Sequence, residues 1–194
     1  MVNSYTVALL VGSLRKEAFS RKLGDALSRL APSSLGLKTV EIGQLPLYNQ
    51  DIEESGKLPS EWIAFRQQVR DADAVLFVTP EYNRSVPGAL KNAIDVGSRP
   101  YGQSVWDGKP GAVASISPGA IGAFGANHHL RQSLVFLNVP TMQQPEAYIG
   151  AAASLFNEHG ELSNDRTKAF LIDFMQAFAH WVDTNVKVAA TVSR

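Results

Sequence analysis

The sequence predicts an α/β fold in which a parallel β-sheet is covered by helices on both faces. Apolar segments of strand length alternate with longer segments of helical period, and this alternation repeats about five times along the chain. The most apolar segment, residues 74–78 (AVLFV), shows no polar alternation, as expected of a strand covered on both faces. No linker or internal repeat interrupts the pattern, so we expect residues 1–194 to form one domain.

Each expected strand is an apolar run that ends at turn-forming residues. The first run stops abruptly at Gly12-Ser13. The second run alternates only weakly, and the last contains Pro145, which cannot donate to a neighbouring strand; both features are typical of strands at or near a sheet edge. The five expected strands are residues 5–11, 35–42, 74–78, 111–117 and 141–149.

The expected helices carry apolar residues at helical spacing. The first begins after the polar loop that follows Ser13, and the last carries a stripe of aromatic residues that we expect to pack in the core. Residues 44–59 contain two prolines and show no clear period, so this segment is expected to be irregular. The five expected helices are residues 19–30, 60–70, 88–96, 127–137 and 165–188.

The composition argues against several kinds of function. Lys and Arg number 18, as do Asp and Glu, so the basic surplus of a nucleic-acid-binding protein is absent and self-association meets little charge repulsion. The chain has no cysteine, which excludes disulfides and thiolate chemistry. The N-terminal segment does not resemble a signal peptide, and no apolar stretch reaches the roughly 20 residues that a membrane span requires. We therefore expect a cytoplasmic protein without a membrane or nucleic-acid partner.

Three loops at the carboxyl ends of the expected strands are candidates for a ligand site. In open parallel sheets, ligands bind outside these ends, where the strand order reverses. With the strand order 2-1-3-4-5 the three loops lie side by side, so one ligand could touch all of them. They are residues 12–15, 80–85 and 118–122.

The first loop suits an anion. The free N–H groups of a helix N-terminus, the hydroxyls of Ser13 and Ser20 and the guanidinium of Arg15 together favour a phosphate. A simple helix cap is the alternative interpretation of these residues. Neither G-x-x-x-x-G-K-[ST] nor G-x-G-x-x-G occurs here, which argues against a nucleoside triphosphate and against a Rossmann dinucleotide site.

The second loop suits the edge of a flat heteroaromatic ring. Pro80 restricts the backbone, and Asn83 offers an amide that both donates and accepts. Glu81 is either an acid or base or a solvated carboxylate, and the alternative for the whole loop is a turn in which Ser85 caps the next helix. His128 and His129 are adjacent in an expected helix and point about 100° apart, so we expect no metal site there.

Two motifs together resemble the NADPH-dependent FMN reductase family, whose members include quinone, azo-dye, chromate and ferric-chelate reductases. The first is G-S-L-R-x-x-x-x-S, from Gly12 to Ser20, and the second is T-P-E-Y-N-x-S-V-P-G-x-L-K-N-A-I-D, from Thr79 to Asp95. The second motif is long and specific, and the resemblance extends from Tyr5 to about Gly150. It implies a flavodoxin-like three-layer α/β sandwich with a five-stranded parallel sheet.

The resemblance also implies a cofactor and a set of site residues. Bound FMN would take hydride from NADH or NADPH and reduce a small acceptor by a ping-pong scheme, so no catalytic side chain is assigned. The expected oligomer is a homodimer or homotetramer. The residues that match the family's cofactor-binding positions are Ser13, Arg15 and Ser20 at the phosphate, Pro80, Glu81, Tyr82 and Asn83 at the ring, and Ser117 and Gly119 on the ring's other side.

A non-enzymatic flavodoxin-like electron carrier or flavin-binding module is the alternative function. Single-electron carriers of this fold are usually strongly acidic, and the formal net charge of zero argues against that interpretation.

Overall fold

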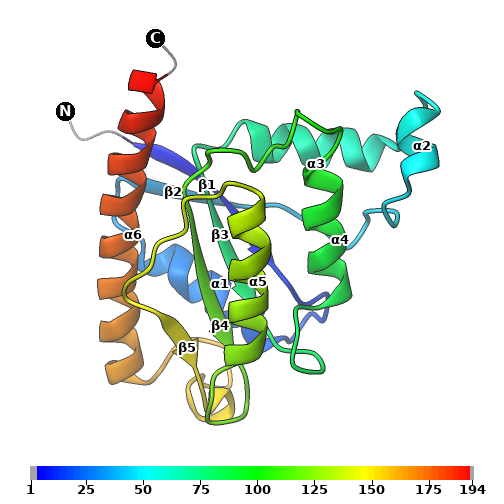
Figure 1. Ribbon diagram of the computed structural model, residues 1–194. Coiled ribbons are helices and arrows are strands. Elements are labelled where there is room, and N and C mark those ends of the chain that lie inside the picture. The colour runs from blue at the N-terminus through cyan, green and yellow to red at the C-terminus, as the bar shows by residue number, and fades with distance from the viewer. Residues whose placement is uncertain (1–3, 193–194) are drawn as a thin grey trace.

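A computed structural model describes residues 4–192 of the chain, and in it five strands form one parallel sheet in the order β2-β1-β3-β4-β5 (Figure 1). The expected strand order is therefore confirmed. The strands are β1 (Tyr5–Val11), β2 (Leu35–Thr39), β3 (Ala74–Thr79), β4 (Gly111–Ile116) and β5 (Ala147–Ile149). The helices are α1 (Phe19–Leu30), α2 (Gln50–Glu54), α3 (Ser60–Arg70), α4 (Gly88–Gly97), α5 (Phe124–Phe136) and α6 (Asp165–Val192), with a single 3₁₀ turn, η1 (Ala152–Ser154), among the described residues.

Helices cover both faces of the sheet and enclose two apolar cores. Leu23 and Leu27 of α1 pack with Phe174 and Phe178 of α6 against one face. Residues of α3, α4 and α5 pack against the other face, where Trp62 is fully buried. Every residue of β3 and β4 is buried, as the unbroken apolar run at 74–78 predicted. The aromatic stripe of α6 is thus part of the core.

Several element boundaries differ from the expectations. The expected length of the last strand is wrong: the continuous ladder with β4 is limited to Ala147–Ile149, and Thr141 makes only an isolated bridge to Gly111 at the start of β4. The intervening segment contains Pro145, which lacks the N–H that a paired strand needs. A short helix, α2, lies in the segment expected to be irregular, and the Asn49 side chain caps it by accepting the Asp51 N–H. α5 begins at Phe124, three residues earlier than expected.

The segment between β2 and α3 is held to the helices by buried polar side chains. The Asn92 Oδ1 on α4 accepts the Tyr48 N–H at 2.8 Å, and the Tyr48 ring stacks on Trp62. Arg66, whose side chain is 5% exposed, forms a two-point ion pair with Glu53 of α2. These contacts fix the segment, including its short helix α2, beside α4, whose N-terminus follows the second candidate loop.

Candidate functional site

The first and second candidate loops meet at Gly12. The Gly12 N–H donates to Val78 O at 2.8 Å, which continues the pairing of β1 with β3 beyond the end of β1. A Cβ on Gly12 would lie 3.1 Å from Pro80 Cδ and 3.3 Å from Thr79 Oγ1, closer than side chains usually approach. A side chain at this position would force its neighbours to shift by a few tenths of an ångström, so glycine favours the close approach of the first loop to the second.

The N-terminus of α1 is uncapped. Its N-cap residue is Ala18, whose side chain makes no capping hydrogen bond, and the first turn holds no acidic residue. Ser20, in that turn, is 1% exposed, and its Oγ has no hydrogen-bond partner among residues 4–192. Burying a hydroxyl without a hydrogen-bond partner costs about 1–3 kcal/mol of folding free energy. An anion bound at this end of the helix would supply the missing acceptor.

Ser13 links the first loop to the second. Ser13 is 2% exposed, and its Oγ lies 3.1 Å from the Tyr82 hydroxyl and accepts the Arg15 N–H at 3.3 Å. Arg15 itself lies on the exposed part of the loop. The structure therefore brings Ser13, Arg15 and Ser20 to one end of α1, with Tyr82 of the second loop in contact.

The second loop is a tight turn with strained backbone. Tyr82 and Ser85 exchange two backbone hydrogen bonds of 3.0 and 3.1 Å, and the residues between them, Asn83 and Arg84, have φ angles of 52° and 64°. Positive φ at both central residues defines a type I′ turn. The backbone N–H groups of Glu81, Asn83 and Arg84 have no partner within the described chain, so this turn presents free donors at the carboxyl edge.

Glu81 is not a solvated carboxylate. Its side chain is 12% exposed, its Oε2 accepts the Ala126 N–H at 3.1 Å, and its Oε1 lies 3.3 Å from an Arg84 guanidinium nitrogen. Ala126 lies in the first turn of α5, and Ser85 also reaches α5, through a 2.8 Å contact between its Oγ and His129 Nδ1. The second loop is therefore attached to α5 at two points.

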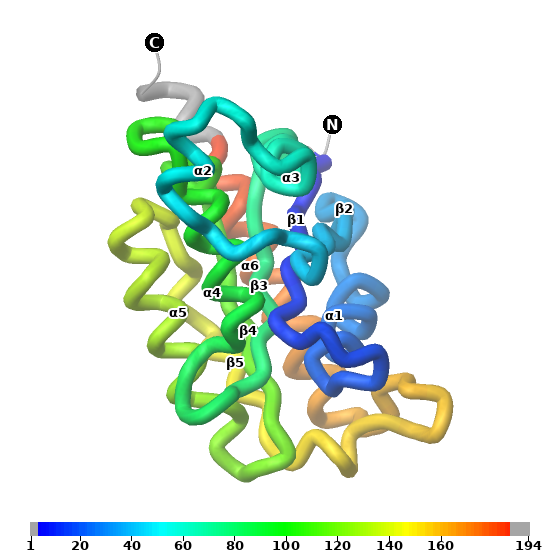
Figure 2. The backbone as a smooth tube through the Cα atoms, turned by 90° about the vertical axis from the view of Figure 1, so that its right-hand side faces the viewer, coloured from blue at the N-terminus to red at the C-terminus, as the bar shows by residue number. Residues whose placement is uncertain are grey.

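The third loop packs mainly on the end of β5. The Ser117 Oγ donates to Gly119 O at 3.2 Å, and the Gly119 and Ser117 carbonyls accept N–H groups from Ala151 and Ala152. Among residues 4–192, no hydrogen bond joins Ser117 or Gly119 to the first two loops. Gly122, with a φ of 59°, could not carry a Cβ, which would lie 2.7 Å from Ile149 N. The loop lies at the expected edge, and all three loops are in the lower half of Figure 2.

A buried polar network that the sequence did not indicate fixes this third loop. Ser115, on β4, donates from its Oγ to Gly122 O at 2.8 Å and accepts from Asn127 Nδ2 at 3.1 Å. Asn127 Oδ1 in turn accepts from Arg131 Nε, and the same guanidinium donates to Met142 O. Polar residues inside an apolar run and on a helix were the only signal. Apart from the Asn127–Arg131 pair on α5, the partners lie 7 to 12 positions apart along the chain.

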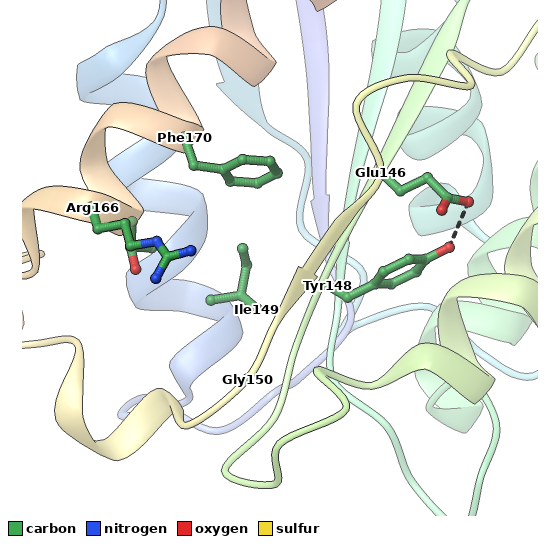
Figure 3. Close-up of a pocket in the computed structure, with 7 residues that line it drawn as sticks. Glu146, Tyr148, Ile149, Gly150, Arg166 and Phe170 are labelled. Atoms are coloured by element: carbon green, nitrogen blue, oxygen red, sulfur yellow. Dashed lines mark hydrogen bonds between the residues drawn. The ribbon is translucent and has the colours of Figure 1, made fainter.

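The edge strand β5 carries a separate hollow (Figure 3). Figure 3 shows Glu146 and Tyr148 on one side of the strand and Arg166 and Phe170 on the other. Burial, together with the hydrogen bond to Glu146, raises the pKa of Tyr148 to about 12, so this hydroxyl stays protonated and donates to Glu146 at 2.7 Å. None of the expected site residues lines this hollow.

The adjacent histidines make separate contacts. His128 Nε2 lies 2.9 Å from the Tyr148 hydroxyl, whereas His129 contacts Ser85 in the second loop. Over the described residues, no group of three or more His, Cys, Asp or Glu side chains is placed to hold a metal ion. Within the same part of the chain, no helix combines the length and apolar character that crossing a membrane requires.

Comparisons with known proteins identify the family of the chain and a solved structure with the same fold. Residues 5–154 match the family model described as NADPH-dependent FMN reductase. The chain is 66% identical over 185 residues to a quinone reductase of Pseudomonas putida, covering 95% of this chain and 98% of the relative. It is 48% identical over 176 residues to a 2-hydroxy-1,4-benzoquinone reductase of a Burkholderia species, covering 91% and 95%. The solved structure of FerB, a flavoenzyme NAD(P)H:(acceptor) oxidoreductase from Paracoccus denitrificans, superimposes with a TM-score of 0.87 at 42% identity, covering 93% of this chain and 98% of FerB.

Proposed function

Because the chain belongs to the NADPH-dependent FMN reductase family, we propose that FMN lies across the carboxyl edge described above, with its phosphate on α1 and its ring on the second loop. The protein is an FMN-dependent NAD(P)H oxidoreductase that reduces quinones or flavins.

The observation that carries this placement is the buried Ser20 hydroxyl without a partner at the uncapped N-terminus of α1. The phosphate of FMN would accept hydrogen bonds from this hydroxyl and from the free N–H groups of the first turn. The positive end of the helix dipole would also stabilise its negative charge. Arg15, exposed on the adjoining loop, would add a charge-assisted contact. The residues present therefore fit a phosphate group.

The second loop fits the ring in a different way. The free N–H groups of its type I′ turn would donate to the carbonyl and nitrogen atoms along the edge of an isoalloxazine. The residues proposed to hold FMN are Ser13, Arg15 and Ser20 at the phosphate, Pro80, Glu81, Tyr82 and Asn83 along the ring, and Ser117 and Gly119 on its other side.

The protein's part in the reaction is binding and orientation. When bound, FMN supplies the two-electron chemistry that links NAD(P)H oxidation to acceptor reduction. We propose no catalytic side chain, because Glu81, the carboxylate of the second loop, is already engaged with Ala126 and Arg84. We also propose that NAD(P)H and the acceptor occupy the same exposed region beside Tyr82 in turn. Double-reciprocal plots should then give parallel lines, and intersecting lines would contradict this scheme.

Small quinones are the acceptors that we propose to test first. The Pseudomonas putida relative is named a quinone reductase, and the Burkholderia relative a 2-hydroxy-1,4-benzoquinone reductase. Steady-state rates with NADH and NADPH should be compared for a benzoquinone, free FMN and a ferric chelate. A carrier without enzymatic activity would bind FMN and yet turn over none of these acceptors.

Ser20→Ala gives the sharpest test of where the phosphate lies. Loss of the unpaired hydroxyl should stabilise the FMN-free protein by about 1 kcal/mol, because an unsatisfied buried group is removed. The same substitution should weaken FMN binding about tenfold or more, because a contact to a charged group is lost. Urea unfolding and fluorescence titration of the FMN-free protein with FMN measure the two effects. Unchanged affinity would place the phosphate elsewhere.

The domain organisation, the oligomeric state and the location are proposed from the fold, the surface and the composition. We propose that residues 1–194 form one domain, since a single sheet covered on both faces takes up the described part of the chain. We propose a homodimer or homotetramer, supported by exposed aromatic side chains such as Tyr101 and Phe136 and by the formal net charge of zero. A cytoplasmic location is proposed from the absence of cysteine and from the use of NAD(P)H.

A further inference from the structure

Glu81 connects two segments that are more than 40 residues apart in the sequence. Its Oε2 accepts the backbone N–H of Ala126 in the first turn of α5, and its Oε1 pairs with Arg84 across the type I′ turn. The α5 N-cap residue, Ala123, is left-handed and makes no side-chain cap. The Glu81 carboxylate therefore supplies, from another part of the chain, an acceptor that this helix N-terminus lacks.

The approach of α5 to the second loop depends on a glycine. A Cβ on Gly125 would lie 2.9 Å from Arg84 O and 2.9 Å from Glu81 Oε2. The second loop therefore rests directly on the first turn of α5. Because α5 follows the third loop, a shift of the second loop away from α5 would change the gap between the two loops proposed to flank the ring.

The turn that Glu81 precedes requires support from its surroundings. Asn83 and Arg84 both hold left-handed backbone conformations, which favour glycine and cost an L-residue free energy. Three hydrogen-bonding contacts join this loop to its surroundings within the described part of the chain: Ser13–Tyr82, Glu81–Ala126 and Ser85–His129. Of these three, only the Glu81 contact is made by a charged acceptor that is largely excluded from water.

We propose that Glu81 is a positioning residue that clamps the second loop to the N-terminus of α5 and so preforms the ring side of the FMN site. It acts through the hydrogen bond to the Ala126 N–H rather than as an acid or base. The inference rests on the proposed function, because it assumes that the second loop receives the ring.

The test compares Glu81→Ala with Glu81→Gln in the full chain. The glutamine amide oxygen can accept the Ala126 N–H, whereas alanine cannot. We expect Glu81→Ala to weaken FMN binding about tenfold or more and Glu81→Gln to stay within about threefold of the wild type. Amide hydrogen exchange in the FMN-free protein should speed up in residues 81–85 and 124–127 for Glu81→Ala alone, while the exchange of β3 and β4 stays unchanged.

Gly125→Ala tests the same contact without altering Glu81. Its Cβ would push the loop from α5, so the loss of FMN affinity and the faster exchange at 81–85 should both recur. Gly36→Ala on β2 is the matched control, because its Cβ would meet only one atom, Tyr5 O at 3.8 Å, and neither readout should change.

The outcomes separate the inference from the proposed function. A wild-type protein that does not bind FMN overturns the proposed function. A wild-type protein that binds FMN, with Glu81→Ala binding equally well, overturns the clamp alone. Equal losses in Glu81→Ala and Glu81→Gln would also overturn it, since the charge rather than the Ala126 hydrogen bond would then matter. Faster exchange across the whole sheet in Glu81→Ala would show a general structural role instead.

Discussion

Arg84 has the left-handed backbone conformation that, in turns, favours glycine. It is the second central residue of the type I′ turn, its φ is 64°, and its side chain is 76% exposed. The guanidinium makes one ion pair, to Glu81 at 3.3 Å, and this pair contributes little because the guanidinium itself is exposed to solvent. The strain at Arg84 is therefore not offset by its own contacts.

Arg84→Gly should consequently stabilise the protein by about 0.5–1 kcal/mol, after the entropy that glycine loses on folding is included. Arg84→Ala is the matched control, because it removes the guanidinium but keeps the Cβ that causes the strain. Urea unfolding of the FMN-free variants measures the difference. A glycine variant no more stable than the alanine variant would mean that the turn relaxes without cost.

Some residues of the candidate site could be predicted from the sequence, but the contacts between them could not. Ser13, Ser20 and Tyr82 were identifiable because they follow strand ends at motif positions, and the structure brings all three to one edge of the sheet. The partner of Glu81 was not predictable, since no local pattern links it to the backbone of Ala126, 45 residues away. The roles of the individual residues stay predictions until FMN binding is measured.

Like α3, α4 and α5, α1 begins without a side-chain cap. Helix N-caps favour Ser, Thr, Asp and Asn, yet α1 starts from Ala18, whose φ of −71° and ψ of 139° would suit a capping side chain. The Arg21 N–H donates to Ala18 O, but the N–H groups of Phe19 and Ser20 have no acceptor among the described residues and are free for the proposed phosphate. In the sequence, the only sign of this uncapped helix end is an alanine at the N-cap position, where a polar residue is usual.

Two substitutions at Ala18 separate capping from charge. Ala18→Asn and Ala18→Asp should each stabilise the FMN-free protein by about 1 kcal/mol, because either side chain can accept an N–H of the first turn. Ala18→Asp should in addition weaken FMN binding at least about tenfold more than Ala18→Asn, because its carboxylate would lie beside the phosphate. Titration with FMN at low and high salt measures this. Equal affinities of the two variants would contradict a phosphate at this helix end.

Element boundaries were less predictable than element types. All five strands were expected, because apolar runs and turn residues are local signals. Their order is not a local signal, and it was expected from the flavodoxin-like fold that the family resemblance implies. The last strand is three residues long instead of nine, since pairing depends on how the chain meets β4 and not on its own composition. α2 was missed because its five residues are held by a cap at Asn49 and by the Arg66–Glu53 pair, neither of which gives a helical period.

At the scale of the whole molecule, some large aromatic side chains lie on the surface and not in the two cores. Both faces of the sheet are buried by helices, yet Tyr101 is 89% exposed and Phe136 is 87% exposed. These two side chains line the same hollow of about 430 Å³, between the segment that follows α4 and the C-terminal end of α5, with Val135 also exposed nearby. Aromatic residues gathered in this way mark an interaction surface more often than single exposed apolar residues do.

A second copy of the chain is the occupant that we expect on this surface. The formal net charge of zero gives two copies little reason to repel each other, and two aromatic rings at a hollow provide both a projecting group and a place to receive one. Light scattering during size-exclusion chromatography should therefore give a mass of two or four chains of 21.0 kDa.

Phe136→Asp should lower that mass, because a buried carboxylate at the contact lacks a partner. Ile63→Asp, which alters a single exposed apolar residue on α3, is the control and should leave the mass unchanged. FMN titration of the Phe136 variant then tests whether assembly and cofactor binding are coupled. Unchanged affinity would mean that one chain holds FMN alone, whereas a wild-type mass of 21.0 kDa would exclude the oligomer altogether.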